Sequence, residues 1–172
     1  MKKFIQLILI LFTSCALKED YYQLSIDDYL VTVGYDDGEY MRIAYDFNIK
    51  DELEANEVIK DVNIFLNGKL LGVGEFTNRK NKAISSDKAK LTKLTVYLND
   101  LDGRTFKLNG EPLDSSIKKT CDKYNGTYIE KNGYACVIQT EISKQLNVVE
   151  LYGDYLNLNQ DEIDHIVIYV DE

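Results

Sequence analysis

Alternation of apolar and polar side chains, interrupted by glycines that follow asparagine or aspartate, is the feature that most limits how this chain can fold. In EYMRIAYDFNI, at residues 39–49, every second side chain from Met41 to Ile49 is apolar, which is the two-residue period of a half-buried strand. Asn-Gly and Asp-Gly pairs accept the positive φ angles of tight hairpin turns. Six of the ten glycines follow Asn or Asp: Gly38, Gly68, Gly103, Gly110, Gly126 and Gly133. The pattern predicts an antiparallel β body over residues 26–108.

The predicted strands follow one another around these turns. YLVTVGY, at residues 29–35, leads through a predicted hairpin turn at Asp36-Asp37-Gly38 into residues 39–49. VNIFLNGKLLGVGEF contains two strands around Asn67-Gly68, and LTKLTVYL leads through Asp102-Gly103 to RTFKL. Residues 77–93, TNRKNKAISSDKAKLTK, interrupt the pattern with six basic side chains and one acid. We interpret this only basic segment as a long, solvated loop.

One helix is predicted, in DSSIKKTCDKYNG at residues 114–126. An apolar stripe recurs there at helical spacing, through Leu113, Ile117, Cys121 and Tyr124. Asp114 or Ser115 can cap its start, and Asn125-Gly126 can end it. TYIE and YACVI, on either side of Lys131-Asn132-Gly133, predict a hairpin directly after the helix.

Cys121 and Cys136 predict a disulfide that joins the end of this helix to the second strand of the hairpin. In an exported chain, of the kind that the first residues predict below, two cysteines besides Cys15 favour one disulfide. The absence of a C-x-x-C motif favours a structural one. Residues 140–162 fit either a helix or a strand, and HIVIYV predicts a final strand. We therefore expect a mainly β (α+β) fold: an antiparallel, sandwich-like body with one short helix and a disulfide-stapled hairpin. Residues 109–172 form the helix-and-hairpin extension, packed on the same body.

The beginning of the chain has the layout of a secretory signal. MKKFIQLILILFTSC places two lysines before a short apolar run, which is far below the ~20 residues that a membrane-spanning helix needs. Phe12-Thr13-Ser14-Cys15 resembles the lipobox of bacterial lipoproteins, with Phe12 where Leu is usual. The resemblance covers only these first residues. It implies removal of residues 1–14, acylation of Cys15, including palmitate, and a tether over residues 15–25.

The same resemblance implies a location in the bacterial cell envelope, in the outer membrane, facing the periplasm or the surface. Removing 14 of the 172 residues leaves 158, and the 20 basic side chains lose Lys2 and Lys3. The remaining 18 basic and 29 acidic side chains have a formal balance of −11. Such a surface repels nucleic acid and favours a basic partner. We therefore expect another envelope or secreted protein as the partner, and no nucleic acid.

Residue types that most active sites require are scarce. His165 is the single histidine, and we interpret it as a surface residue at the start of the last strand rather than a catalytic base. The cysteines lack the spacing of a zinc site. Asp100 and Asp102 before Gly103, and NLNQDEID at residues 157–164, both depart from the pattern of an EF-hand calcium loop. We expect no cofactor and no metal.

Tyrosine is the abundant aromatic residue, with 13 copies and no tryptophan. Tyrosine is enriched at interfaces because it combines a large contact area with a polar tip, although it can equally fill a core. The candidate interaction surface consists of Tyr40, Tyr97, Tyr128, Tyr134, Arg79, Lys80 and Lys82.

We interpret the chain as a lipid-anchored, non-catalytic protein-binding module, acting as an inhibitor, an immunity factor or a component of an envelope assembly. Two alternatives remain from the sequence. One is an envelope hydrolase that acts on cell-wall glycan through two carboxylates. The other is a module that binds carbohydrate or another small ligand through tyrosine side chains.

Overall fold

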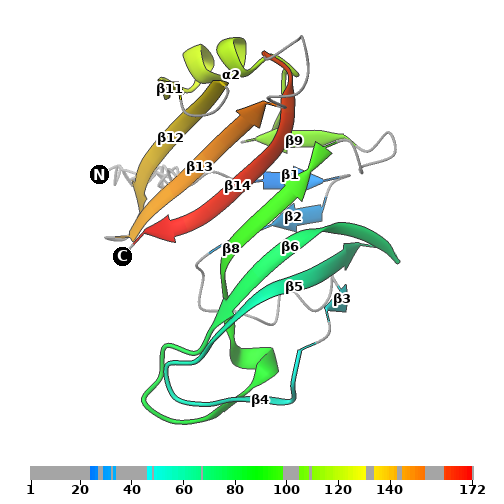
Figure 1. The fold of residues 1–172 in the computed structure, drawn as a ribbon, viewed down its shortest axis with the longest axis vertical. Helices are drawn as coiled ribbons and strands as arrows, with labels where there is room; N and C mark the ends of the chain where they lie inside the picture. Colours follow the sequence, from blue (N-terminus) through cyan, green and yellow to red (C-terminus); the bar gives the residue numbers. More distant parts are fainter. Residues whose placement is uncertain are drawn as a thin grey trace, which may run out of the picture.

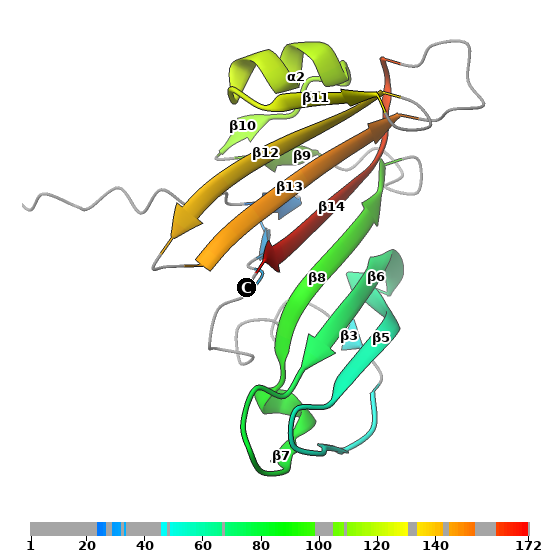
Figure 2. The ribbon, with the colours of Figure 1, turned by 60° about the vertical axis from the view of Figure 1, so that its left-hand side comes forward.

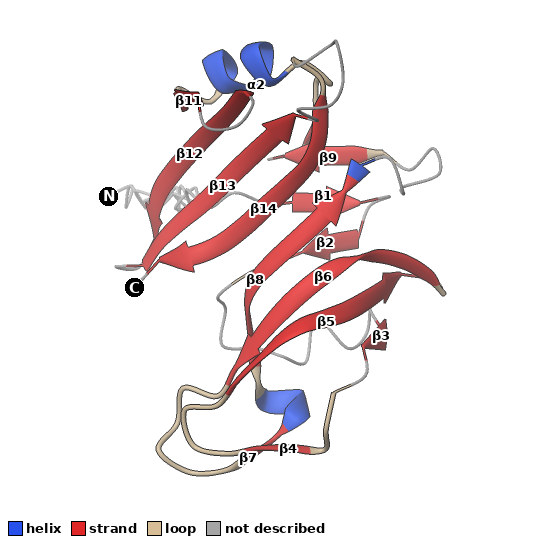
Figure 3. Ribbon diagram, in the orientation of Figure 1, coloured by secondary structure: helices blue, strands red, loops and turns tan. Residues whose placement is uncertain are grey.

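The computed structural model describes residues 24–26, 29–31, 33, 46–47, 49–66, 68–98, 105–108, 110–130, 134–142, 145–153 and 161–171. The elements are β1 (Leu24–Ile26), β2 (Tyr29–Val31), β3 (Asp46–Phe47), β4 (Glu52–Leu53), β5 (Val58–Leu66), β6 (Lys69–Thr77), β7 (Ile84–Ser85), the 3₁₀ turn η1 (Ser86–Lys88), β8 (Lys90–Tyr97), β9 (Phe106–Leu108), β10 (Glu111–Pro112), α2 (Ile117–Lys123), β11 (Thr127–Glu130), β12 (Tyr134–Ile142), β13 (Gln145–Gly153) and β14 (Ile163–Asp171). Figure 3 shows strands through most of this structure and α2 at one end.

The largest sheet has eight antiparallel strands in the order β11-β12-β13-β14-β8-β6-β5-β3. β5 and β6 form the predicted hairpin, and Gly68 in its turn has a φ of 74°. β11 and β12 form the second predicted hairpin. The final strand, β14, lies between β13 and β8 (Figure 1). Strands from the second half of the chain therefore continue the sheet that the first half begins.

A second sheet, in the order β10-β9-β1-β2, lies behind the large sheet in both Figure 1 and Figure 2. Alternate side chains of the large sheet face it and are almost fully buried, among them Val96, Leu151 and Ile166. β9 adds Phe106 and Leu108 to the same core. Two layers that share one core confirm the expected mainly β, sandwich-like body.

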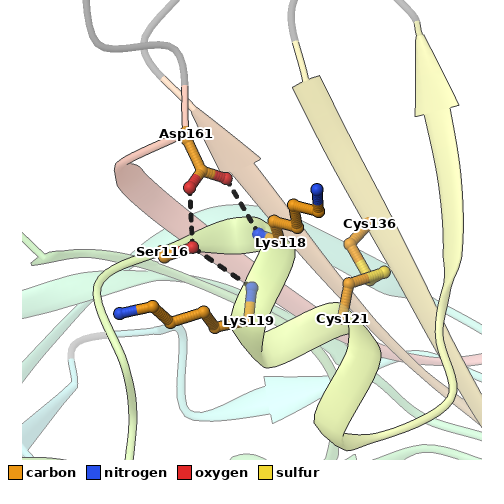
Figure 4. Close-up of a disulfide and its surroundings, with 6 residues drawn as sticks. All are labelled: Ser116, Lys118, Lys119, Cys121, Cys136 and Asp161. Atoms are coloured by element: carbon orange, nitrogen blue, oxygen red, sulfur yellow. Dashed lines mark hydrogen bonds between the residues drawn. A yellow bond between two sulfur atoms is a disulfide. The ribbon is translucent and has the colours of Figure 1, made fainter.

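Helix α2 begins at a cap that the sequence pattern did not identify. Ser116 Oγ accepts a hydrogen bond from the Lys119 main-chain N–H at 3.1 Å and lies 2.6 Å from Asp161 Oδ2, to which it donates. Asp161 Oδ1 also accepts from the Lys118 N–H at 2.9 Å (Figure 4). The prediction of Asp114 or Ser115 as the cap was wrong, because Asp114 instead accepts from the Ser116 N–H at 2.9 Å.

The predicted disulfide between Cys121 and Cys136 is present and joins α2 to β12 (Figure 4). Both half-cystines are at most 1% exposed. Asn125 ends the helix with a φ of 53°, as expected for a left-handed stop. Gly126 then passes so close to the two sulfur atoms that a Cβ there would lie 2.5 Å from Cys136 Sγ and 2.9 Å from Cys121 Sγ. A helix end, a turn and a strand are thus packed around one disulfide.

The chain changes sheet at two places where its sequence suggests a local turn. β8 pairs with β6 and β14, whereas β9 pairs with β1 and β10, so the connection through Asp102-Gly103 joins two sheets. The first two predicted strands, which contain β2 and β3, also belong to different sheets: β2 pairs with β1 and β3 pairs with β5. Their described parts therefore do not pair with each other as the predicted hairpin required. The predicted turn at residues 36–38 lies outside the described residues. The ambiguous region after residue 140 forms strands, the end of β12 and then β13.

Candidate functional site: an aromatic row beside a carboxylate

The large sheet has an outer face, which we define as the face opposite the second sheet. Strand register determines which side chains share it. His165 on β14 lies directly across from Tyr97 on β8 and from Tyr152 on β13. These three residues alternate with the buried Val96, Ile166 and Leu151, so they belong to the outer face. We call Tyr97, His165 and Tyr152 the aromatic row.

The rings of the aromatic row pack against one another. Tyr152 and His165 are stacked, with centroids 4.8 Å apart and planes 8° apart. This distance equals the usual spacing of neighbouring strands. The Tyr97 ring is tilted by 42° from the His165 ring, and the centroids of these two rings are 5.6 Å apart. Tyr152 and His165 therefore each cover one face of the other's ring.

His165 also contacts its sequence neighbour. Its Nδ1 lies 2.8 Å from Asp164 Oδ2, and the side chains of the two residues are 27% and 28% exposed. The expectation of a partly exposed histidine in the last strand agrees with this position. Its ring is a member of the aromatic row rather than an isolated surface group.

Glu150 lies one level along β13 from the aromatic row, directly across from Val167 on β14. Each of its carboxylate oxygens accepts one phenolic hydrogen bond: Tyr152 donates to Oε2 at 2.5 Å and Tyr169 donates to Oε1 at 2.9 Å. Val167 is 8% exposed, so an apolar side chain borders the carboxylate. We call Glu150, Tyr152 and Tyr169 the acceptor cluster.

Burial, followed by the hydrogen bond to Glu150, raises the pKa of Tyr152 well above its ordinary value. The cause is that a phenolate beside a carboxylate is disfavoured in partly apolar surroundings. The Tyr152 hydroxyl therefore stays protonated at neutral pH and remains a donor to Glu150. The geometry of the acceptor cluster depends on that proton.

A second carboxylate on the outer face provides a direct contrast. Glu75 on β6 lies across from Lys93 on β8. It lies 3.7 Å from the Lys93 Nζ and 3.8 Å from the Lys60 Nζ. Glu75 thus forms ion pairs with two lysines, whereas Glu150 forms no ion pair with any residue of the described ranges.

The structure separates the residues that the sequence grouped as an interaction surface. Tyr97 is in the aromatic row and is 40% exposed. Tyr128 on β11 is also 40% exposed, but it lies across from the buried Cys136 and so belongs to the other face of the sheet. Tyr134 begins β12, and its side chain is outside the description. Tyr40 and the lipidation candidate Cys15 lie outside the described residues.

The basic segment with Arg79, Lys80 and Lys82 lies beyond the opposite end of β8 from Tyr97 (Figure 1). It is an organised loop built around Asn78, which is fully buried. The Asn78 side-chain amide donates to the main-chain oxygens of Leu53, Glu54 and Lys82 at 2.7–3.2 Å, and its Oδ1 accepts from the Lys80 N–H at 2.9 Å. Lys80 and Lys82 are exposed, but the prediction of a solvated loop over residues 77–93 was wrong for its second half. That half contains β7, η1 and the start of β8, and it buries Ile84, Ala89 and Leu91 in the core.

Glu150, Tyr152 and Tyr169 are not among the candidate site residues that the sequence suggests. The available signal was alternation: residues 148, 150 and 152, and residues 165, 167 and 169, share one face of their strands. That pattern does not reveal that β13 and β14 are neighbours in the register that joins Glu150 to Tyr169.

Asp161, within the NLNQDEID segment that was considered for calcium, serves as a hydrogen-bond acceptor at the start of α2. Nowhere in the described ranges do three or more His, Cys, Asp or Glu side chains gather in a way that could hold a metal ion. Among the helices of the same ranges, none has the length and apolar character needed to span a membrane.

Comparison with known proteins gives no relative from which a role could be transferred. No protein-family model, no curated protein and no solved structure matches this chain.

Proposed function

We propose that this chain is a non-catalytic protein-binding module of the bacterial envelope, and that its partner docks on the outer face of the large sheet at the aromatic row. The proposal rests on one observation: three aromatic rings pack side by side on the face opposite the second sheet, and one of them, Tyr97, is 40% exposed. Aromatic residues in such central positions commonly dominate the binding energy of protein interfaces.

The orientation of the rings favours a protein over a sugar. Carbohydrate platforms present flat ring faces, whereas Tyr152 and His165 cover each other's faces at 8°. Ring edges, hydroxyl groups and a carboxylate suit the mixed apolar and polar surface of another protein. The 29 acidic and 18 basic side chains that remain after removal of residues 1–14, a formal balance of −11, favour a basic partner, mainly through faster association at low salt.

Attachment through Cys15 is part of the same proposal and is supported by the lipobox-like FTSC. Two or more acyl chains hold a protein stably at a bilayer, at ~0.8 kcal/mol per buried CH₂. Replacing Cys15 with Ala is expected to release the protein from membranes, measured by fractionation and by the mass of the first peptide. A variant that still partitions with membranes contradicts this attachment.

Capture from the native membrane, with matched tyrosine variants, tests the binding role. The full chain, Tyr97→Lys and Tyr128→Lys serve as baits, because the two tyrosines are equally exposed but lie on opposite faces of the sheet. We expect one stoichiometric protein with the wild-type chain and with Tyr128→Lys, and its loss with Tyr97→Lys. The captured protein is then purified, and its affinity for all three chains is measured directly.

Two results contradict the proposal. One is equal affinity of the purified partner for the Tyr97 and Tyr128 variants, which removes the aromatic row from the interface. The other is turnover of cell-wall glycan by the purified chain without a protein partner, which indicates the hydrolase instead.

A further inference from the structure

The acceptor cluster is rich in hydrogen-bond acceptors and poor in donors. A phenol carries one donor hydrogen, and an ionised carboxylate carries none. The hydroxyl hydrogens of Tyr152 and Tyr169 both point to Glu150. Any further group that approaches these oxygens must therefore donate, which excludes carboxylates and phosphates as ligands.

The charge of Glu150 adds a second requirement. The carboxylate is half-buried beside Val167 and forms no ion pair with a described residue. Electrostatic attraction is stronger in such partly apolar surroundings than in water. The nearby carboxylate Glu75 already has Lys60 and Lys93 as counter-ions. Of the two described carboxylates Glu75 and Glu150, Glu150 is therefore the one whose charge is available to an incoming cation.

From these two observations we propose that the acceptor cluster binds an arginine side chain of the partner protein. The guanidinium group has five N–H donors, no acceptor and a permanent positive charge. It can donate to Glu150 and to the phenolic oxygens together. The inference rests on the proposed function, because it names the chemistry that the partner presents to the same face.

The substitution Glu150→Gln removes the negative charge of residue 150 while keeping the shape of its side chain. A glutamine amide offers an oxygen that accepts one tyrosine hydroxyl and an N–H₂ group that donates to the other, so the packing around residue 150 is retained. Glu75→Gln is the matched control on the same face, because its carboxylate is paired with lysines. Thermal unfolding of each variant shows whether it is folded.

The probe is N-acetyl-arginine methylamide, titrated into the full chain in a non-ionic detergent and followed by NMR of labelled tyrosines. The neutral control probe is the corresponding citrulline derivative, which has the same shape without the charge. We expect the resonances of Tyr152 and Tyr169 to shift with the arginine probe. We expect Glu150→Gln to weaken this binding about tenfold, because charge-assisted hydrogen bonds are roughly twice as strong as neutral ones. Glu75→Gln should leave it within about twofold.

Three results overturn the assignment: equal binding of the citrulline probe, unchanged binding by folded Glu150→Gln, or stronger shifts of the same tyrosines with N-acetylglucosamine. The outcome is separable from that of the proposed function. If the partner's affinity depends on Tyr97 but is the same for Glu150→Gln and wild type, the proposed docking face stands and the proposed arginine contact is refuted. If the partner's affinity does not depend on Tyr97, the proposed docking face itself is refuted.

Discussion

An alanine at position 126 tests whether the disulfide staple requires a residue without a side chain. A Cβ at Gly126 would lie 2.5 Å from Cys136 Sγ, 2.9 Å from Cys121 Sγ and 3.0 Å from Ile138 Cγ1. Non-bonded heavy atoms pack best at about 3.5–4.0 Å. The three neighbouring side chains are at most 1% exposed, so they have little room to move. We expect Gly126→Ala to prevent closure of the disulfide or to displace the end of α2 from β12.

The magnitude follows from the loop that the disulfide closes. Cys121 and Cys136 are separated by 15 residues, and a loop of this length corresponds to about 3 kcal/mol in the chain-entropy model. For a protein of this size, 1 kcal/mol changes the Tm by about 2–4 °C. Loss of the bond should therefore lower the Tm by about 6–12 °C.

The assay combines non-reducing peptide mapping with urea unfolding. Gly126→Ala is compared in the native chain and in a chain with Cys121→Ala and Cys136→Ala, where the sulfur atoms are absent. We expect a cost of about 3 kcal/mol in the native chain and less than about 1 kcal/mol in the second background. Gly68→Ala is the control, because its φ is 74° but nothing lies within 4 Å, so it should keep the disulfide. A quantitatively formed disulfide with wild-type stability in Gly126→Ala refutes the reasoning.

Three further substitutions test the loop, the helix cap and the acceptor cluster. Asn78→Ala leaves the buried Leu53 oxygen and two partly buried main-chain oxygens without their donor, and it should lower the free energy of unfolding by roughly 1–3 kcal/mol. The exposed control Asn81→Ala should stay within about 0.5 kcal/mol; equal values for the two variants in urea unfolding contradict the role of Asn78. Asp161→Ala should cost about 1 kcal/mol and speed hydrogen exchange in the first turn of α2; unchanged exchange there argues against the cap. Because the pKa of Tyr152 is raised in the folded chain, the unfolded chain loses this proton first, and stability falls as pH rises above the ordinary tyrosine value of about 10. Tyr152→Phe should make that fall shallower in urea unfolding between about pH 9 and 11.5, and an identical slope contradicts the coupling to Glu150.

Local patterns predicted much of the secondary structure because their causes lie within a few residues. The turn at Asn67-Gly68 and the alternation on either side predict the β5–β6 hairpin, which is present. The helical spacing from Ile117 to Cys121 predicts α2, and the proximity of that helix to the next hairpin predicts the disulfide. In each case neighbouring side chains determine the backbone conformation.

The same patterns failed where a contact joins distant segments. The Ser116–Asp161 cap spans 45 residues, so no signal near Ser116 distinguishes it from Asp114 or Ser115. The grouping of Tyr97 with Tyr128 rested on residue type, yet their strands place them on opposite faces of the sheet. Which face a side chain occupies depends on a register that only the assembled sheet defines.

The sequence by itself determined that this chain forms antiparallel strands, the helix α2 and a buried disulfide, because alternation, turn residues and helical spacing are local properties. Only the tertiary structure decided that β14 lies between β13 and β8. That placement aligns Tyr97, His165 and Tyr152 at one level and brings Tyr169 to Glu150. The physical reason is that alternation specifies which side chains share a face of one strand, whereas strand order and register follow from burial of the whole sheet against its partner layer.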